Sequence, residues 1–266
     1  MRVLHRCWMI TAAFMVVVYG CASTGENQVL SADEQYARAL DLYERRNYVE
    51  AVSALQAFSF NYPQDPRVED TRWLTAQAYY GAKDWVTAAQ EYLGFQRDFQ
   101  RGEQAPEALY QAARSYEQLS LRPELDQRDT ERAINMYERL TTEYSRSGFV
   151  EEAKEKRRRL RNKLAEKVYL NAEYYFDHDR YEAAEIYLVD LIEKYPDSDW
   201  LAASYSLLAE TFCQQGLRDR ASELYELLLD TFPDSDASSE VDDRLPSGCR
   251  GAGPAAAQLE AETAGR

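Results

Sequence analysis

The sequence predicts an all-α fold, an α-solenoid of five helix pairs, and three repeated features support this prediction. An aromatic, Pro, Asp, Ser, Asp phrase occurs at residues 195–199 and again at 232–236. An alanine stands eleven residues before an aromatic residue five times along the chain. Apolar residues follow each of these alanines at offsets of four and seven. The same local structure is therefore expected five times.

The repeated phrase predicts helix boundaries. Proline has no amide hydrogen and clashes with the preceding helical turn, so a helix is expected to end before it. Serine and aspartate accept hydrogen bonds from the free amides at the start of a helix. Each phrase is therefore expected to end one helix and to begin the next.

The second helix of each pair is predicted from the alanine and the residues after it. Offsets of 0, 4, 7 and 11 lie on one face of a helix with 3.6 residues per turn. This face is expected to be buried in every repeat. The alanine and aromatic pairs are Ala51 and Tyr62, Ala88 and Phe99, Ala133 and Tyr144, Ala184 and Tyr195, and Ala221 and Phe232.

The first helix of each pair is marked by another alanine, which would let two helices approach closely. In four repeats this first-helix alanine stands twelve residues before the second-helix alanine. In the third repeat an insertion lies between the two alanines. These alanines are Ala39, Ala76, Ala112, Ala172 and Ala209. Residues 78–92 and 172–196 resemble tetratricopeptide repeats, which are helix pairs of about 34 residues. Such pairs must stack on neighbours to bury their apolar faces.

The spacing of the repeats predicts two groups. Repeats one to three are expected over residues 32–148, with a loop insertion around residues 119–129, where Pro123 disfavours a helix. Residues 149–170 keep a helical apolar stripe, which predicts a long linking helix. This helix and repeats four and five are expected over residues 149–234.

The N-terminus resembles that of a bacterial lipoprotein. Two arginines precede an apolar run over residues 7–19, which is too short to cross a bilayer of about 30 Å. The letters VYG before Cys21 resemble the lipoprotein cleavage box, which implies a signal peptide over residues 1–20 and acyl chains on Cys21. Residues 21–31 would be the tether, and Ala22 favours sorting to the outer membrane, facing the periplasm. The alternative is an ordinary signal peptide beside an incidental cysteine.

The C-terminal residues 235–266 are predicted to be a disordered tail, because they carry few large apolar side chains. The cell envelope is often oxidising, so a disulfide between Cys213 and Cys249 is left open. The simpler interpretation is that Cys213 replaces an aromatic residue of the repeat.

The charge of the chain argues against nucleic acid as a partner. The formal net charge is −15, whereas proteins that bind nucleic acid neutralise phosphates with basic residues. Residues 154–163 form the one dense basic run, KEKRRRLRNK. It is either a solvated helix face or a surface on which Arg157, Arg158 and Arg161 dock an acidic partner or lipid headgroups.

The sequence does not predict an enzyme, a cofactor or a metal site. Outside the expected signal peptide it has one histidine, His178, between Asp177 and Asp179. Adjacent residues at a turn rarely converge on one ion, so a polar turn is expected there. No glycine-rich phosphate loop, nucleophile elbow or HExxH motif occurs. These observations indicate a binding protein.

Aromatic residues on the first helices are candidates for peptide binding. By resemblance to tetratricopeptide geometry, the residue nine before the second-helix alanine faces the core and the next residue faces a binding groove. The expected core residues are Leu42, Tyr79, Tyr175 and Phe212. The expected groove residues are Tyr36, Tyr43, Trp73, Tyr80, Tyr116, Tyr169 and Phe176. A shift of one residue exchanges the two sets, so these rings alternatively fill the seam between helices.

The order of the motifs resembles the BamD family of outer-membrane protein assembly lipoproteins. The resemblance covers the lipoprotein box, the repeats, the insertion LDQRDTERAI and residues 164–198. It implies a subunit of the β-barrel assembly machine that works beside other assembly lipoproteins and is held at the membrane by its lipid anchor. Repeats one to three would receive the C-terminal strand of unfolded outer-membrane proteins. The last two repeats would dock on a periplasmic domain of the barrel subunit.

One position departs from that family. Tyr187 stands where relatives often carry an arginine that pairs with the barrel subunit, so this ion pair is not expected here. The alternative function is a repeat lipoprotein that organises cell-wall synthesis or division. Such relatives tend to carry an N-terminal coiled coil, and no sustained heptads occur between Cys21 and Ala39.

Overall fold

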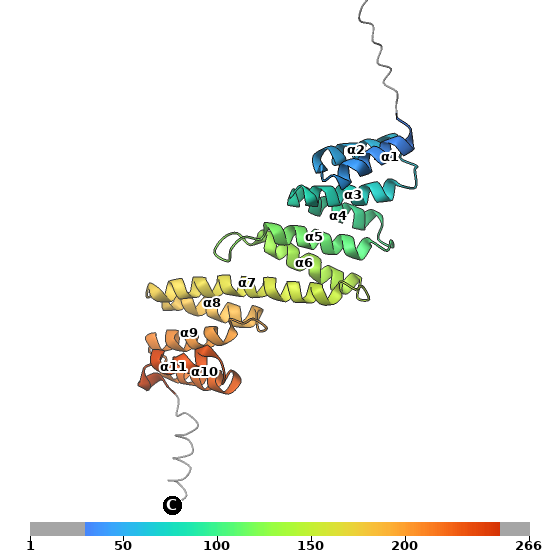
Figure 1. Cartoon of the computed structure of the whole chain (residues 1–266). Coiled ribbons are helices and arrows are strands. Elements are labelled where there is room, and N and C mark those ends of the chain that lie inside the picture. Colours follow the sequence, from blue (N-terminus) through green and yellow to red (C-terminus); the bar gives the residue numbers. More distant parts are fainter. Residues whose placement is uncertain (1–29, 251–266) are drawn as a thin grey trace, which may run out of the picture.

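The computed structural model describes residues 30–250, and within this range it is all-helical. The described residues form eleven α-helices and one short 3₁₀ helix and contain no strand, which confirms the predicted fold class (Figure 1). The helices are α1 (Ala32–Glu44), α2 (Tyr48–Asn61), α3 (Val68–Gly81), α4 (Trp85–Asp98), α5 (Ala105–Leu119), α6 (Arg128–Glu143), α7 (Val150–Asp177), α8 (Tyr181–Lys194), α9 (Leu201–Gln214), α10 (Arg218–Thr231), α11 (Asp236–Arg244) and η1 (Ser247–Cys249).

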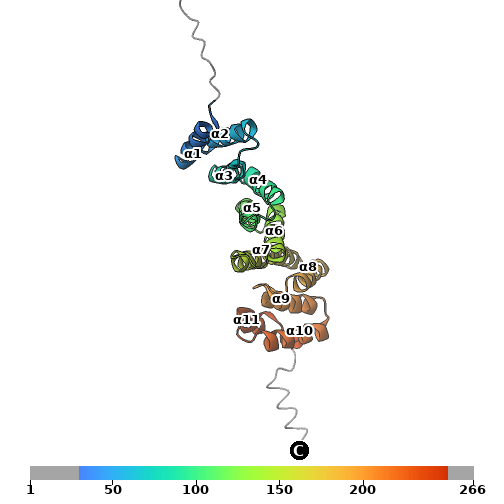
Figure 2. The same cartoon turned by 90° about the vertical axis from the view of Figure 1, so that its right-hand side faces the viewer.

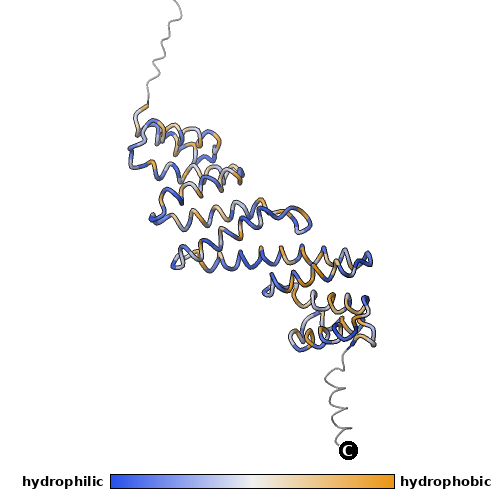
Figure 3. The backbone as a smooth tube through the Cα atoms, turned by 180° about the vertical axis from the view of Figure 1, so that it is seen from behind, coloured by the Kyte–Doolittle hydropathy of each residue, from blue (hydrophilic) through white to orange (hydrophobic). Residues whose placement is uncertain are grey.

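The helices stack in chain order into an elongated array. Each helix from α1 to α10 packs against the helix that follows it. Figure 2 shows α1, α3, α5 and α7 along one edge of the array and α2, α4, α6 and α8 along the other. Figure 3 shows apolar residues recurring along the helices between hydrophilic stretches. The array therefore has a first-helix face and a second-helix face.

The alanines that define the repeats lie where the sequence predicts them. All ten are fully buried, with an exposed fraction of 0%. They sit where paired helices approach each other, so any larger side chain there would have to push the helices apart. The ten are Ala39, Ala51, Ala76, Ala88, Ala112, Ala133, Ala172, Ala184, Ala209 and Ala221.

The turns inside four of the repeats share one backbone feature. After the first helix, one residue has a positive φ: Arg46, Lys83, Asp179 or Gly216. This conformation costs about 1–2 kcal/mol for a residue with a Cβ atom, and glycine avoids that cost. Only the last of these four turns uses glycine.

The insertion in the third repeat is held by polar contacts. The Gln127 side chain is buried, and its amide donates hydrogen bonds to the carbonyl oxygens of Arg122 (2.6 Å) and Leu125 (3.2 Å). From α7, Lys167 donates to the Leu125 carbonyl (2.7 Å) and Lys163 to the Ser120 hydroxyl (2.8 Å). The long helix therefore fixes the position of the insertion.

Helix α7 spans 28 residues and joins two parts of the core. Val150, Ala153 and Leu160 belong to a cluster with residues of α5 and α6. Ala165, Tyr169 and Ala172 belong to a second cluster with residues of α8, α9 and α10. One continuous helix thus connects the first three repeats to the last two.

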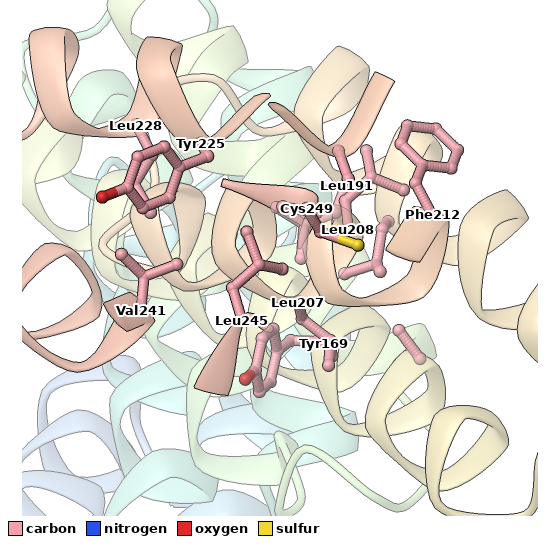
Figure 4. Close-up of a cluster of buried hydrophobic side chains, with 14 of the residues drawn as sticks. Tyr169, Leu191, Leu207, Leu208, Phe212, Tyr225, Leu228, Val241, Leu245 and Cys249 are labelled. Carbon is pink, nitrogen blue, oxygen red and sulfur yellow. The ribbon is translucent and has the colours of Figure 1, made fainter. Parts of the chain in front are cut away.

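The prediction of a disordered C-terminal tail is wrong for residues 236–249. Helix α11 begins after Ser235, whose hydroxyl accepts a hydrogen bond from the Ser238 amide (3.1 Å). Val241 and Leu245 are fully buried in the cluster that Figure 4 shows. The two side chains lie one helical turn apart, so they form a short apolar face that packs in one cluster with α9 and α10. Residues 251–266 lie outside the described residues.

Cys213 of α9 and Cys249 of η1 form a disulfide, with Cα atoms 5.8 Å apart. The interpretation that Cys213 only replaces an aromatic residue of the repeat is therefore wrong. The predicted signal peptide, Cys21 and the tether up to residue 29 lie outside the described residues. In the described range, no helix is both long and apolar enough to cross a membrane.

Candidate binding surfaces

The predicted groove residues share a helix face with the buried alanines. Tyr36 and Tyr43 stand three residues before and four residues after Ala39, and Trp73 and Tyr80 do the same around Ala76. Positions at these offsets lie on one side of a helix. The rings therefore point toward the seam between helices, which was the alternative that the sequence left open.

Trp73 is a core residue, so its assignment to a binding groove is wrong. Its exposed fraction is 7%, and its ring lies 5.5 Å from Tyr92 and 5.2 Å from Phe95, both on α4. Tyr169 is buried in the same way and packs against Trp200 with the ring centroids 4.8 Å apart. Neither ring is available to a peptide without unfolding of its repeat.

The other four predicted peptide-binding residues are half-buried and keep one accessible side. Most of them contact a polar residue of the next repeat. The Tyr43 hydroxyl donates to Gln77 Oε1 on α3 (3.1 Å), and the Arg67 guanidinium lies 5.0 Å from the Tyr36 ring centre. The Arg114 guanidinium lies 5.4 Å from the Tyr80 ring centre.

Tyr116 differs slightly, because its ring is covered by Arg132 of α6 within the same repeat, at 5.6 Å. We call Tyr36, Tyr43, Tyr80 and Tyr116 the aromatic row. The row runs along α1, α3 and α5 and offers ring faces beside guanidinium and amide groups. Such groups suit an extended peptide that carries aromatic side chains and free backbone amides.

A close contact between helices positions the start of the row. The Tyr48 ring of α2 lies 5.9 Å from the Tyr43 ring. The same Tyr48 ring rests on Gly81, where an added Cβ atom would lie 2.5 Å from it. A larger residue at this position would therefore displace the Tyr48 ring.

Two tyrosines of the row are held in the neutral form. Burial is the main cause that raises the pKa of Tyr43 above its usual value, and nearby Tyr48 adds to it. Burial also raises the pKa of Tyr36, with Asp70 contributing. Both hydroxyls therefore remain hydrogen-bond donors throughout the physiological pH range.

The predicted core residues of the first helices are less buried than expected. Phe212 is buried, whereas Leu42, Tyr79 and Tyr175 are half-buried. Leu42 lines an open hollow of about 420 Å³ between α1 and α2, on the outer side of the first repeat. Within residues 30–250, α1 is the first helix, and no described helix packs on this side of it.

A second candidate surface lies on α8 around Tyr187. The Tyr187 ring stacks on Tyr175 with centroids 5.3 Å apart, and Ile186 has an exposed fraction of 69%. A hollow of about 770 Å³ lies there. Its lining combines apolar residues with four carboxylates, Glu182, Glu185, Asp190 and Glu193. This surface, which we call the α8 surface, suits an apolar partner segment that carries basic residues.

The α8 surface continues into a neighbouring hollow between α8, α9 and α10. This hollow measures about 380 Å³ and shares Val189 and Glu193 with the first one. Leu224 and Leu227 of α10 line its far side, and the Arg220 guanidinium lies 3.9 Å from the Phe212 ring centre. The apolar strip therefore crosses from the fourth repeat to the fifth.

Two of the arginines predicted to dock a partner already form hydrogen bonds and ion pairs within the chain. Arg161 donates to the Lys194 carbonyl (2.8 Å) and to Asp197 (2.9 Å). Arg158 pairs with Glu155 at 3.2 Å and lies 3.6 Å from Asp199. They brace the turn between α8 and α9 against α7, and the hydrogen bond from Arg161 lowers the pKa of Asp197.

Arg157 is half-buried and adds positive charge near Asp197, which also lowers the pKa of that carboxyl. The basic run thus acts first as a structural brace. Its exposed side keeps Arg159 and Lys154, which pair with Glu155 (3.5 Å) and Glu151 (2.7 Å) on the same helix. These side chains therefore do not form a free cationic docking patch.

His178 lies at the end of α7, and its Nδ1 atom is 2.7 Å from the Tyr174 carbonyl oxygen. Within residues 30–250, no group of three His, Cys, Asp or Glu side chains is arranged to hold a metal ion.

Comparison with known proteins identifies the family of the chain. The family model described as outer membrane lipoprotein, YfiO, matches residues 29–228. The chain belongs to this family. The outer membrane protein assembly factor BamD of Vibrio cholerae serotype O1 is 22% identical over 223 residues, which cover 80% of this chain and 92% of the relative.

Solved tetratricopeptide-repeat structures also resemble the chain. The TPR2AB domain of yeast Sti1 in its pHSP90 complex has a TM-score of 0.40 and 16% identity, and the match covers 79% of this chain and 81% of that chain. The TPR domain of P58(IPK) has a TM-score of 0.42 and 16% identity, with coverages of 79% and 54%.

Proposed function

We propose that this protein is a non-catalytic, lipid-anchored subunit of the machinery that folds and inserts β-barrel proteins into the outer membrane. Membership of the outer membrane lipoprotein family supports this proposal, as does the name of the Vibrio cholerae relative. The fold also supports it, because stacked helix pairs provide extended surfaces for other proteins. In this role the protein holds substrates and partner subunits without changing any covalent bond.

The sequence and the disulfide together support the proposed location. Acylation of Cys21 would anchor the chain, and more than one acyl chain gives stable membrane attachment. The Cys213–Cys249 bond indicates an oxidising compartment, because disulfides are rare in reducing cytosol. Both features agree with a protein held at the outer membrane and facing the periplasm.

The aromatic row is the observation that carries the proposed substrate site. In barrel proteins, the sequence segments that form the strands alternate apolar and polar side chains, and an unfolded barrel protein presents these segments as extended chain. Tyr36, Tyr43, Tyr80 and Tyr116 offer ring faces to such side chains, while Gln77 and Arg114 offer hydrogen-bonding groups to the backbone. Rigid aromatic side chains of this kind dominate binding energies at protein interfaces.

A peptide titration tests this site. The ligand is a ten-residue synthetic peptide with alternating apolar residues and a C-terminal phenylalanine, and the protein is the detergent-solubilised lipoprotein. Tyr43→Ala with Tyr80→Ala should weaken binding at least ~10-fold, because each lost ring contact costs about 1 kcal/mol or more. Trp73→Ala is unsuitable as a probe, because it opens a cavity in the core.

Tyr174→Ala is the matched control, because this tyrosine on α7 has an exposed fraction of 58% and lies outside the row. It should leave the affinity unchanged. Circular dichroism should show the same helix content in all three proteins. Equal affinity of the double variant and the parent would remove the aromatic row as the substrate site.

The α8 surface is the proposed docking site for the barrel subunit of the machinery, through one of its periplasmic domains. Tyr187, Ile186 and the surrounding carboxylates favour an apolar and basic segment of that subunit. Other assembly lipoproteins would join the complex elsewhere on the array. This charge pattern replaces the ion pair that an arginine at position 187 would form.

Co-purification from detergent-solubilised envelopes tests the docking site. Ile186→Asp should abolish recovery of a β-barrel subunit with periplasmic domains, because it places a charge in the apolar strip. Val49→Asp is the control, since Val49 is equally exposed, at 71%, but lies on α2. Recovery of peptidoglycan-associated proteins instead of a barrel subunit would favour a scaffold for cell-wall synthesis or division.

A further inference from the structure

The last described segment closes the C-terminal end of the array. We call α11 and η1, residues 236–249, the C-terminal cap. Val241, Leu245 and Cys249 of the cap are buried in one cluster with Leu207 of α9 and Leu228 of α10. Figure 4 shows these side chains facing one another. The cap therefore covers apolar side chains that would otherwise form the exposed end of the fifth repeat.

The cap has little stability of its own. Helix α11 has nine residues, and isolated helices shorter than about 12–15 residues are marginal in water. Its polar links to the array include a hydrogen bond from Ser238 to the Phe232 carbonyl (2.6 Å). Arg244 contacts Tyr169 of α7 and lies 4.0 Å from Glu210 of α9. Docking of the cap thus depends on three buried side chains and on the disulfide.

The disulfide is placed where it controls this docking. It joins Cys213, near the end of α9, to Cys249, the last residue of η1, and closes a loop with a sequence separation of 36 residues. The cap is the last part of that loop, and the bond ties its final residue back to α9. The bond therefore keeps the cap near the surface on which it packs. Without the bond, the cap is held only by contacts that a short helix makes and loses rapidly.

We propose that the C-terminal cap is a redox-dependent lid on the last repeat. A dithiol reductant transfers two electrons and two protons to the Cys213–Cys249 bond, which yields two thiols, and the dithiol itself becomes a disulfide. The cap then undocks from α9 and α10 and exposes their apolar side chains at the end of the array. In the oxidised protein this apolar end is covered, and in the reduced protein it is exposed. This inference rests on the proposed location in an oxidising envelope and not on the proposed role in barrel assembly.

The direction of the switch follows from the compartment. A chain that has just entered an oxidising envelope is reduced and uncapped, and oxidation completes the fold of the last repeat. The apolar end is then exposed only before oxidation or after reduction. An array of this kind stays soluble when its terminal faces are covered, so the cap also protects the end from association.

The test uses the full lipoprotein, purified in detergent without reductant. Alkylation followed by peptide mass spectrometry should show Cys213 and Cys249 blocked until dithiothreitol is added. Amide hydrogen exchange over residues 236–249 should then become at least ~10-fold faster, because a freed short helix opens readily. Exchange over residues 105–143, in the third repeat, should not change. Removal of the reductant and reoxidation should restore the slow exchange.

Two variants provide reference values for the exchange rate of an undocked cap. Cys213→Ser with Cys249→Ser should exchange like the reduced protein and should not respond to dithiothreitol. Leu245→Asp should speed exchange over the cap even when the disulfide is intact, which defines the signal of an undocked cap. If the double serine variant does not fold, the reduction of the parent protein decides alone.

Two outcomes would overturn the proposal. Alkylation of both cysteines without reductant would mean that the protein carries no disulfide in the envelope. Unchanged exchange over residues 236–249 after complete reduction would mean that packing alone holds the cap.

Discussion

The two ends of the array are finished in different ways. At the N-terminal end, Leu42 lines an open hollow of about 420 Å³, and Phe60 of α2 has an exposed fraction of 85%. At the C-terminal end, the cap buries Leu245 and Val241, and a disulfide fixes it. The difference shows that a stacked array needs a separate element to close an end, because a repeat cannot cover its own outer face.

The contrast has a consequence for stability. Repeat arrays gain stability from each repeat and from each interface between neighbours. Among the described residues, the capped end has one more interface than the open end, and a cross-link supports it. We therefore expect substitutions at the C-terminal end to destabilise the protein more than matched substitutions at the N-terminal end.

The largest expected difference comes from one matched pair of leucines. Leu245→Asp places a charge at a fully buried position and should lower the free energy of unfolding of the last repeats by ~4 kcal/mol or more. Leu42→Asp changes a half-buried residue that water already reaches, so the loss should be about 1 kcal/mol. Urea unfolding followed by amide exchange at each end measures both values. Equal losses would mean that the two ends do not differ.

A smaller effect is expected in the turns at positive φ. Gly216→Ala in the last repeat should lower the free energy of unfolding by about 1 kcal/mol, because alanine is strained at φ 78°. Arg46→Gly in the first repeat relieves the same strain at φ 60° and should stabilise by up to ~1 kcal/mol. Opposite signs of the two changes in urea unfolding would support this explanation, and equal signs would contradict it.

A pH effect is expected at the capped end from a carboxyl group whose pKa is raised. Burial raises the pKa of Glu210 above its ordinary value of 4.5, and Arg244 partly offsets this. The folded state therefore binds this proton more tightly than the unfolded state. Its contribution to stability is present below the unfolded pKa and is lost as the pH rises through the folded pKa.

Glu210→Gln should remove that dependence. It should raise the free energy of unfolding near neutral pH by less than ~1 kcal/mol and should have no such benefit in acid, as urea unfolding at both pH values would show. Glu240→Gln is the control, because Glu240 is an exposed partner of Arg244 at 2.7 Å. It should change the stability by only a few tenths of a kcal/mol at either pH. A pH dependence that survives in Glu210→Gln would contradict the assignment.

The helix pairs could be predicted from the sequence because their signal is repeated. Ala51 and its four counterparts are each followed by the same apolar offsets, so one irregular repeat does not hide the pattern. Buried small residues are also required by geometry, since paired helices meet there. All ten alanines of the pattern are fully buried.

The direction of individual rings could not be predicted with equal success. Tyr36 and Trp73 occupy the same place in successive repeats, yet Trp73 is buried because Tyr92 and Phe95 of α4 surround it. Tyr36 meets Phe58 at 5.5 Å, and the Arg67 guanidinium lies over both rings, 5.0 Å from the centre of Tyr36 and 5.3 Å from that of Phe58. The neighbouring residues on the second helix determine how exposed each ring is, and no repeated sequence pattern predicts those neighbours.

The cap was missed for a different physical reason. Its apolar content is limited to a few side chains within a polar stretch, so composition alone indicated disorder. The disulfide joins residues that belong to no repeated pattern, and pairing of cysteines cannot be deduced from their positions. Three buried side chains and one cross-link were enough to offset the ordering entropy of this segment.

The smallest effect is expected at the most exposed ring of the open end. Phe60→Ser should change the free energy of unfolding by no more than about 0.5 kcal/mol, because this ring has little apolar surface to lose from the fold. Phe58→Ser, two residues away on the same helix and fully buried, should cost about 4 kcal/mol. Thermal unfolding of both variants measures the difference. A loss above ~1 kcal/mol for Phe60→Ser would mean that some other part of the chain covers this end, and the contrast between an open and a closed end would then fail.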